Sequence, residues 1–281
     1  MALKHILGVD HVVVAARDLA RAARDWEALG FTVSPRGLHS PILGTANHTI
    51  MLGEDYVELL SPVAETEQNQ PTRDFLAAGE GIERIAFTTD DAEAGAAEIS
   101  ARGFPAIGPI HFGRPVPLPG GGEAEARFSV FRWPLSERPG ATRIFACQHR
   151  TREVVWLPEL QAHANGAVAL RRIEILSADP AAAAAHLARL TDQAAVQEGD
   201  AWRVASGPNR ADFVFYDAQG LAARYPAAAR EGARAEGVVA LAIASRDLDA
   251  AAAASGAIHH GEAATVPAGR AAGVIVSFVA A

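Results

Sequence analysis

Cysteine and long apolar segments are both scarce in this chain, and each scarcity excludes a class of protein. Cys147 is the single cysteine among 281 residues, so an intramolecular disulfide and a cysteine-rich zinc site are excluded. No run of about 18 apolar residues is present that could span a bilayer, and Met1–Val9 carries too short an apolar stretch for a secretory signal. These absences predict a cytoplasmic protein without a membrane partner.

A basic excess is also lacking. The formal net charge of −8 at pH 7 provides no positive field that would hold a phosphate backbone, so we expect no nucleic-acid partner. Hydrophobic residues make up 49% and charged residues 21% of the chain, which is typical of a globular protein that buries a core. A small molecule is therefore the expected partner.

One order of elements repeats along the chain. In its first copy, Val9–Arg17 is predicted to be a buried strand, and Asp18 is the expected N-cap of a helix over Leu19–Leu29. The strands expected after this helix are Phe31–Ser34, Asn47–Leu52 and Tyr56–Ser61.

The same order returns three more times, each time with an aspartate before the helix. These aspartates are Asp91, Asp179 and Asp247. The pattern predicts four βαβββ modules, with modules 1 and 2 in residues 1–160 and modules 3 and 4 in residues 161–281. The Pro- and Gly-rich segment Gly113–Glu125 is predicted to be a flexible loop or lid.

Two polar side chains interrupt apolar strands of the first module. His11 lies in a run of valines, and Glu58 lies between Val57 and Leu59. A buried polar group without a partner costs about 1 to 3 kcal/mol, and an unpaired buried carboxylate costs more or shifts its pKa. An imidazole and a carboxylate on neighbouring strands can share a divalent cation such as zinc, iron, manganese or nickel. The other interpretation is a buried network in which His11 and Glu58 bond each other or Arg84.

The segments Val9–Val14, Gly30–Phe31 and Tyr56–Leu60 resemble the first module of the vicinal oxygen chelate superfamily, specifically its glyoxalase-like domain group. This superfamily includes glyoxalases, bleomycin-resistance proteins and dioxygenases. The resemblance implies an α+β fold in which four βαβββ modules pair into curled mixed sheets that form an open cup. It also implies metal ligands on the first and last strands of two paired modules, which places His11 and Glu58 at ligand positions.

The second module departs from this ligand pattern. Arg84 stands where a ligating histidine is expected, and a guanidinium offers no lone pair to a metal. The last strand of the module offers Gln148 and His149 on alternate faces, so one of them faces the cup. With His149, the expected metal ligands are His11, Glu58 and His149, the two-histidine, one-carboxylate arrangement of oxygen-activating iron enzymes. With Gln148, the site resembles the mixed Gln/Glu/His centres of some glyoxalases.

Further polar residues near these strands form the expected substrate site. Glu58 and His149 are the expected catalytic residues, and Arg84 is expected to bind an anionic group bidentately. The other residues of the expected substrate site are Asn47, His48, Gln148, Trp156 and His163.

Two functions are compatible with these residues. The first is a metal-dependent lyase, isomerase or dioxygenase that acts on a small oxygen-bearing substrate, for which Arg84 suggests an anionic group. The second is a metal-free protein of the bleomycin-resistance type that binds or sequesters a small molecule, and Arg84 at a ligand position favours it. Modules 3 and 4 are expected to be degenerate, because Arg172 and Ala240 occupy their ligand positions. The expected oligomeric state is a monomer or a homodimer.

Overall fold

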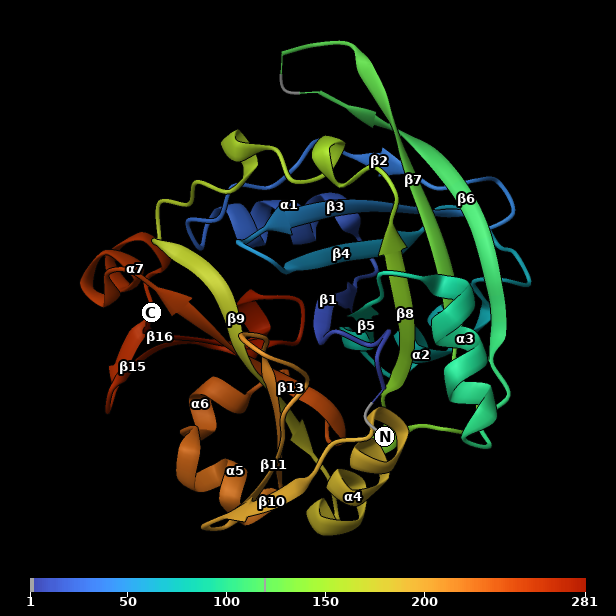
Figure 1. Ribbon diagram of the computed structural model, residues 1–281. Helices are drawn as coiled ribbons and strands as arrows, with labels where there is room; N and C mark the ends of the chain where they lie inside the picture. Colours follow the sequence, from blue (N-terminus) through green and yellow to red (C-terminus); the bar gives the residue numbers. More distant parts are fainter. Residues whose placement is uncertain (1–2, 119) are drawn as a thin grey trace.

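Two eight-stranded mixed sheets form the part of the chain that the computed structural model describes, residues 3–118 and 120–281 (Figure 1). Sheet A has the strand order β2-β3-β4-β1-β5-β8-β7-β6, and sheet B has the order β10-β11-β12-β9-β13-β16-β15-β14. The two orders are equivalent position by position. The predicted α+β fold of four βαβββ modules, paired into curled sheets, is therefore confirmed.

The bounds of the elements follow the modules. The strands of sheet A are β1 Val9–Ala15, β2 Gly37–Leu38, β3 Thr45–Met51, β4 Tyr56–Pro62, β5 Gly81–Thr88, β6 Ile107–Pro117, β7 Glu123–Arg132 and β8 Arg143–His149. The strands of sheet B are β9 Ala167–Leu176, β10 Ala195–Glu198, β11 Ala201–Val204, β12 Asp212–Tyr216, β13 Gly237–Ser245, β14 Ile258–His260, β15 Ala263–Val266 and β16 Ile275–Ala280. The α-helices are α1 Leu19–Glu27, α2 Gln70–Ala77, α3 Ala92–Ala101, α4 Pro180–Thr191, α5 Ala218–Arg224, α6 Ala227–Arg230 and α7 Leu248–Ser255.

The four predicted cap aspartates all begin helices. Each carboxylate accepts a hydrogen bond from the backbone N–H three residues later, which satisfies a donor that the first helical turn leaves free. The capped helices are α1 (Asp18), α3 (Asp91), α4 (Asp179) and α7 (Asp247).

Two predicted segments differ from the structure. The segment 31–34 is not a strand, because the Phe31 ring packs into the core against Trp26 and Phe278, at centroid distances of 5.3 and 5.8 Å. The loop predicted over Gly113–Glu125 is largely a β-hairpin, in which β6 continues to Pro117 and β7 begins at Glu123. Its prolines are tolerated because β6 is an edge strand, where a missing N–H costs no ladder hydrogen bond.

The main core lies between the two sheets. Apolar residues from one face of each sheet and from α1, α3, α4 and α7 form one continuous cluster. Phe87 of β5 stacks on Phe213 of β12 at 5.7 Å, so the two sheets meet back to back. The opposite, concave face of each sheet therefore points away from its partner sheet.

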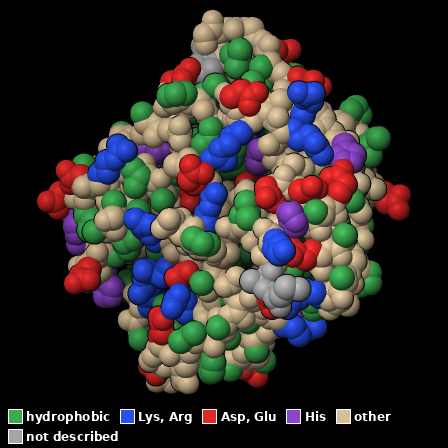
Figure 2. Space-filling view, in the orientation of Figure 1, with side chains coloured by type: hydrophobic (Ala, Val, Ile, Leu, Met, Phe, Trp, Pro, Cys, Tyr) green, Lys and Arg blue, Asp and Glu red, His purple; other side chains and the backbone are tan. Residues whose placement is uncertain are grey.

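The concave face of sheet A is nearly closed into a barrel, because its edge strands β2 and β6 contact each other. A Cβ atom on Gly37 of β2 would lie 2.7 Å from Nη1 of Arg114 in β6, so a larger residue there would displace this guanidinium. On the outer surface, basic and acidic side chains are interspersed (Figure 2). None of the helices within the described ranges is long and apolar enough to cross a membrane. The division into domains 1–160 and 161–281 stays a prediction.

Candidate metal and active site

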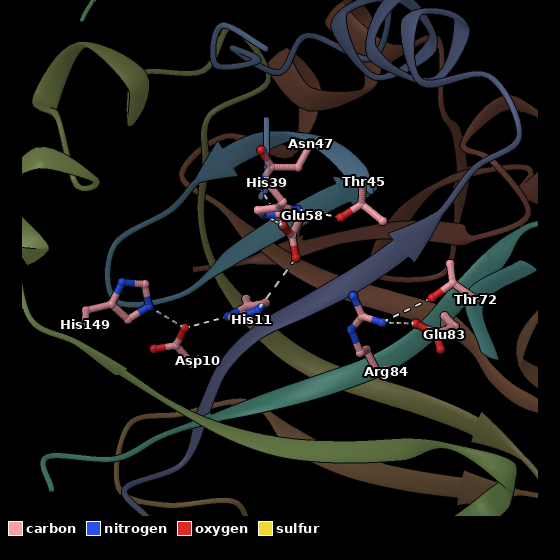
Figure 3. Close-up of polar contacts among 10 residues, drawn as sticks. All are labelled: Asp10, His11, His39, Thr45, Asn47, Glu58, Thr72, Glu83, Arg84 and His149. Carbon is pink, nitrogen blue, oxygen red and sulfur yellow. Dashed lines mark hydrogen bonds and ion pairs between the residues drawn. The ribbon is translucent and has the colours of Figure 1, made fainter. Parts of the chain in front are cut away.

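His11 and Glu58 face the concave side of sheet A from the adjacent parallel strands β1 and β4. Nε2 of His11 lies 3.9 Å from Oε2 of Glu58 (Figure 3). The two side chains are only 4% and 9% exposed, yet neither atom has a hydrogen-bond partner among the described residues. A buried imidazole nitrogen and a buried carboxylate oxygen thus face each other with one open position on each.

Asp10, which the sequence analysis did not select, orients His11. Its Oδ1 lies 2.6 Å from Nδ1 of His11 and 3.0 Å from Nε2 of His149, while Thr88 donates to Oδ2 at 3.0 Å. Burial raises the pKa of Asp10, but His149 and His11 outweigh burial and hold this pKa well below its ordinary value. Because an ionised carboxylate only accepts hydrogen bonds, both imidazoles donate to it. In the neutral form of each imidazole, the lone pair is then on Nε2 of His11 and on Nδ1 of His149.

Glu58 is held on its other oxygen by Asn47 and lies near His39, a residue that the sequence analysis missed. Asn47 donates to Oε1 at 2.6 Å, and Nε2 of His39 lies 3.8 Å from the same oxygen. Burial lowers the pKa of His39 to about 4, so this imidazole is neutral near pH 7. Burial raises the pKa of Glu58, but His39, His11, Arg84 and the bond from Asn47 together bring it below its ordinary value.

His149 and Gln148 point to opposite faces of β8, as strand alternation requires. His149 lies on the concave face, where its ring is 4.8 Å from that of Trp156, and its buried Nδ1 has no partner among the described residues. Gln148 turns the other way, donating to the carbonyl of Asp90 and accepting from the N–H of Ala92. Of the two residues, His149 therefore shares the cup with His11.

Arg84 does not pair with Glu58. Its Nη1 donates to Glu83 at 2.7 Å and to Thr72 of α2 at 3.3 Å (Figure 3). A strand irregularity between β1 and β5 accompanies this arrangement. Glu58 thus stays available to another cation, although Arg84 is near enough to lower its pKa.

The remaining residues of the expected substrate site are dispersed. Asn47 is in the cup beside Glu58, and Trp156 covers His149 from the segment after β8. Nδ1 of His48 lies 2.7 Å from the carbonyl of Ser34, outside this cluster. His163 accepts from the N–H of Thr32 and donates to the carbonyl of Met51, so both of its nitrogens are occupied in a structural link.

Within residues 3–118 and 120–281, two groups of side chains have the chemistry to hold a cation. Bonds from zinc to nitrogen or oxygen measure about 2.0–2.2 Å, so one ion can contact two atoms that are 3.9 Å apart, and the His11–Glu58 pair fits. The second group is Asp10, Cys147 and His149, whose donor atoms lie within 4.8 Å of one another. There, hydrogen bonds already occupy Asp10, and burial raises the pKa of Cys147 well above its ordinary value, which keeps the thiol protonated. The first pair is the better site because its facing atoms are unsatisfied.

Comparison with known proteins agrees with this architecture. A hypothetical protein from Staphylococcus aureus superposes with a TM-score of 0.68 at 14% identity, covering 97% of this chain and 99% of that one. A mutant 4-hydroxymandelate synthase from Streptomyces coelicolor gives 0.57 at 14% identity, covering 90% and 75%. Methylmalonyl-CoA epimerase from Mycobacterium tuberculosis gives 0.41 at 16% identity, covering 55% and 96%. At 14% identity, the two superpositions with TM-scores of 0.68 and 0.57 show a shared fold and nothing more.

The paired βαβββ modules and the curled sheets define a protein of the vicinal oxygen chelate superfamily. Within that class, the family model described as a glyoxalase-like domain matches residues 9–191, and the chain belongs to this family. No curated protein matches the chain.

Proposed function

We propose that this protein is a metal-dependent enzyme that moves a proton on a small oxygen-bearing substrate, as an isomerase or lyase does. The observation that carries the proposal is the facing pair of Nε2 of His11 and Oε2 of Glu58, which are buried, 3.9 Å apart and without hydrogen-bond partners among the described residues. His11 and Glu58 would hold a divalent cation, with His39 as the nearest further imidazole. A bound cation supplies Lewis-acid stabilisation of negative charge on a substrate oxygen.

The protein's own groups supply the remaining chemistry. Asp10 keeps the Nε2 lone pair of His11 directed at Glu58, as carboxylates behind metal-binding histidines do. His149 carries its lone pair on Nδ1 and can accept a proton there, while Asp10 stabilises the imidazolium that forms. A proton taken from a substrate carbon and returned to its neighbour balances an isomerisation without a further reactant. Tyr56, Phe128 and Trp156 surround this imidazole and exclude water.

Metal content of the purified protein tests the proposal. After reconstitution with zinc, manganese, nickel or iron(II), wild type is expected to retain about one ion per chain, and Glu58→Gln to lose it. The matched control is Cys147→Ser, which alters the second donor group and is expected to retain the ion. Loss of metal in Cys147→Ser with retention in Glu58→Gln would place the cation at Asp10, Cys147 and His149 and overturn the assignment.

A second function is a metal-free protein that binds a small molecule in the same cup. Arg84 at an expected ligand position favours it, since a guanidinium cannot ligate a metal. If wild type binds none of the four metals, this second function replaces the first.

A further inference from the structure

Arg114 of β6 is a buried cation without a counter-ion. Arg114 is only 8% exposed, and its guanidinium forms no hydrogen bond or ion pair with the described residues. Its Cζ lies 5.8 Å from the centre of the Phe128 ring, and its Nη1 lies beside Gly37 of β2. Arginine is rarely buried unless paired, because desolvating an unpaired charge is costly. No carboxylate among the described residues neutralises this guanidinium, so an anionic ligand would supply the missing counter-charge.

The guanidinium lines a small cavity on the concave side of sheet A. The cavity volume is ≈ 30 Å³, which is room for about two water molecules at 10–15 Å³ each. The cavity walls include the polar residues Ser34, Asn47 and Thr49 and the apolar residues Val116, Val155 and Leu157.

This cavity adjoins the candidate metal pair. Asn47 is shared, because it lines the cavity and donates to Glu58 at 2.6 Å. Gly37 lets β2 approach both groups, since a Cβ there would lie 2.5 Å from Oδ1 of Asn47 and 2.7 Å from Nη1 of Arg114. A ligand that filled the cavity would thus extend directly toward Glu58 and His11.

We infer that the substrate is a small carboxylic acid, whose carboxylate binds Arg114 while its oxygen-bearing end lies at His11 and Glu58. The guanidinium fork matches a carboxylate bidentately, and the low dielectric of the cup strengthens the pair. This inference rests on the proposed function for the second end of the substrate only. The carboxylate contact itself needs no metal.

Calorimetric titration with malonate tests the inference, with and without manganese. Wild type is expected to bind malonate, and Arg114→Gln to weaken binding at least about tenfold. Arg127→Gln is the matched control, because Arg127 is an exposed arginine on β7 and is expected to bind as wild type does. Equal affinities of wild type and Arg114→Gln would overturn the inference, as would inorganic phosphate binding more tightly than malonate through Arg114.

Two further variants separate this inference from the proposed function. Glu58→Gln is expected to lose metal yet keep metal-free malonate binding, so failure of the metal site leaves the Arg114 contact measurable. Arg114→Met replaces the unpaired charge with an apolar chain of similar length, and its Tm without ligand is expected to equal or exceed that of wild type. A lower Tm would mean that Arg114 is structural, and would also overturn the inference.

Discussion

Sheets A and B have the same topology, but they differ in whether the buried carboxylate on the concave face forms a short salt bridge with arginine. In sheet A, Oε2 of Glu58 faces His11 across an open gap of 3.9 Å. In sheet B, the fully buried Glu174 of β9 is neutralised by Arg224, whose Nε donates to both carboxylate oxygens at 3.0 Å, and by Arg172 at 3.1 Å. Oε2 of Glu58 thus has no hydrogen-bond partner among the described residues, whereas both oxygens of Glu174 accept from Arg224.

The two concave faces also differ in which helices lie near them. Helices α5 and α6 lie on the concave face of sheet B, where Leu221, Tyr225 and Ala229 pack against β13 and β16. In sheet A the equivalent connection carries α2, whose Thr72 reaches Arg84. A shared fold therefore does not imply a shared site, because side chains and connections decide whether the cup is used.

A large loss of stability is expected at Glu174. Glu174→Ala leaves Arg172 and Arg224 without their buried counter-ion and is expected to cost about 3 kcal/mol, the lower end for broken buried pairs because both arginines are partly exposed. Urea unfolding measures this cost. Glu58→Gln is the counterpart in sheet A and is expected to cost less than about 1 kcal/mol, since no salt bridge shorter than 3.8 Å is lost. Equal losses would break the comparison.

The junction between the sheets should make stability depend on pH. Both oxygens of Asp55, before β4, accept from the N–H of Leu170 in β9 at 3.0 and 3.2 Å. Burial raises the pKa of Asp55 from its ordinary value of 3.8 to about 7, although the hydrogen bond from Leu170 and the charges of Arg210 and Arg171 oppose burial. The folded state therefore binds the proton more tightly than the unfolded state. The contribution of the protonated Asp55 to the free energy of unfolding is fully present below about pH 4 and is lost as pH rises through about 7.

Unfolding free energies at pH 4 and pH 8 measure the loss, which is at most about 4 kcal/mol at about 1.4 kcal/mol per pKa unit. Asp55→Asn is expected to remove this part of the pH dependence. The exposed Asp74→Asn is the control and should keep it. An unchanged pH profile in Asp55→Asn would show that this contact does not titrate in the expected range.

A smaller effect is expected on metal affinity at Asp10. Asp10→Asn removes the negative charge behind His11 and should weaken manganese binding by about 10–100-fold, as loss of such partners generally does. Thr88→Val removes only the hydroxyl that donates to Oδ2, and its effect should be under about threefold. Calorimetric titration of each variant with manganese measures the two changes in affinity. Equal effects would mean that Asp10 acts through packing rather than through charge.

The smallest effects should be the same in both sheets. Asp18→Ala in sheet A and Asp247→Ala in sheet B each remove one N-cap hydrogen bond, at 2.9 Å in both cases. Each is expected to cost about 1 kcal/mol of unfolding free energy. Thermal unfolding measures both. A difference of more than about 1 kcal/mol between the two variants would show that the modules are not energetically equivalent.

The repeated modules were predictable because caps, valine-rich strands and glycine stops are local signals. Asp18, Asp91, Asp179 and Asp247 mark the helices within one or two residues of their observed starts. The hairpin of β6 and β7 was missed because proline at an edge strand is locally indistinguishable from proline in a loop. The strand predicted after Gly30 was wrong because tertiary packing takes Phe31 into the core.

The candidate site was only partly predictable. His11 and Glu58 stood out as polar residues in apolar strands, and Asp10 carries the same signal one residue earlier. His39 and Arg114 carry no such signal, since His39 follows a two-residue strand and Arg114 lies among prolines and glycines. Only the curvature of sheet A, which brings β2 against β6, places His39 near Glu58 and Arg114 in the cavity that Asn47 lines.

The covering of sheet B by α5 and α6 has a consequence for competition. Because these helices are tethered to β12 and β13 by a few residues, their effective concentration at the concave face far exceeds that of a free metabolite. To bind there, a small molecule would have to displace Arg224 from Glu174. It would also have to displace residues 221–229 from their apolar contacts with β13 and β16. The chain's own helices thus occupy the concave face of sheet B, although its strand order is equivalent to that of sheet A.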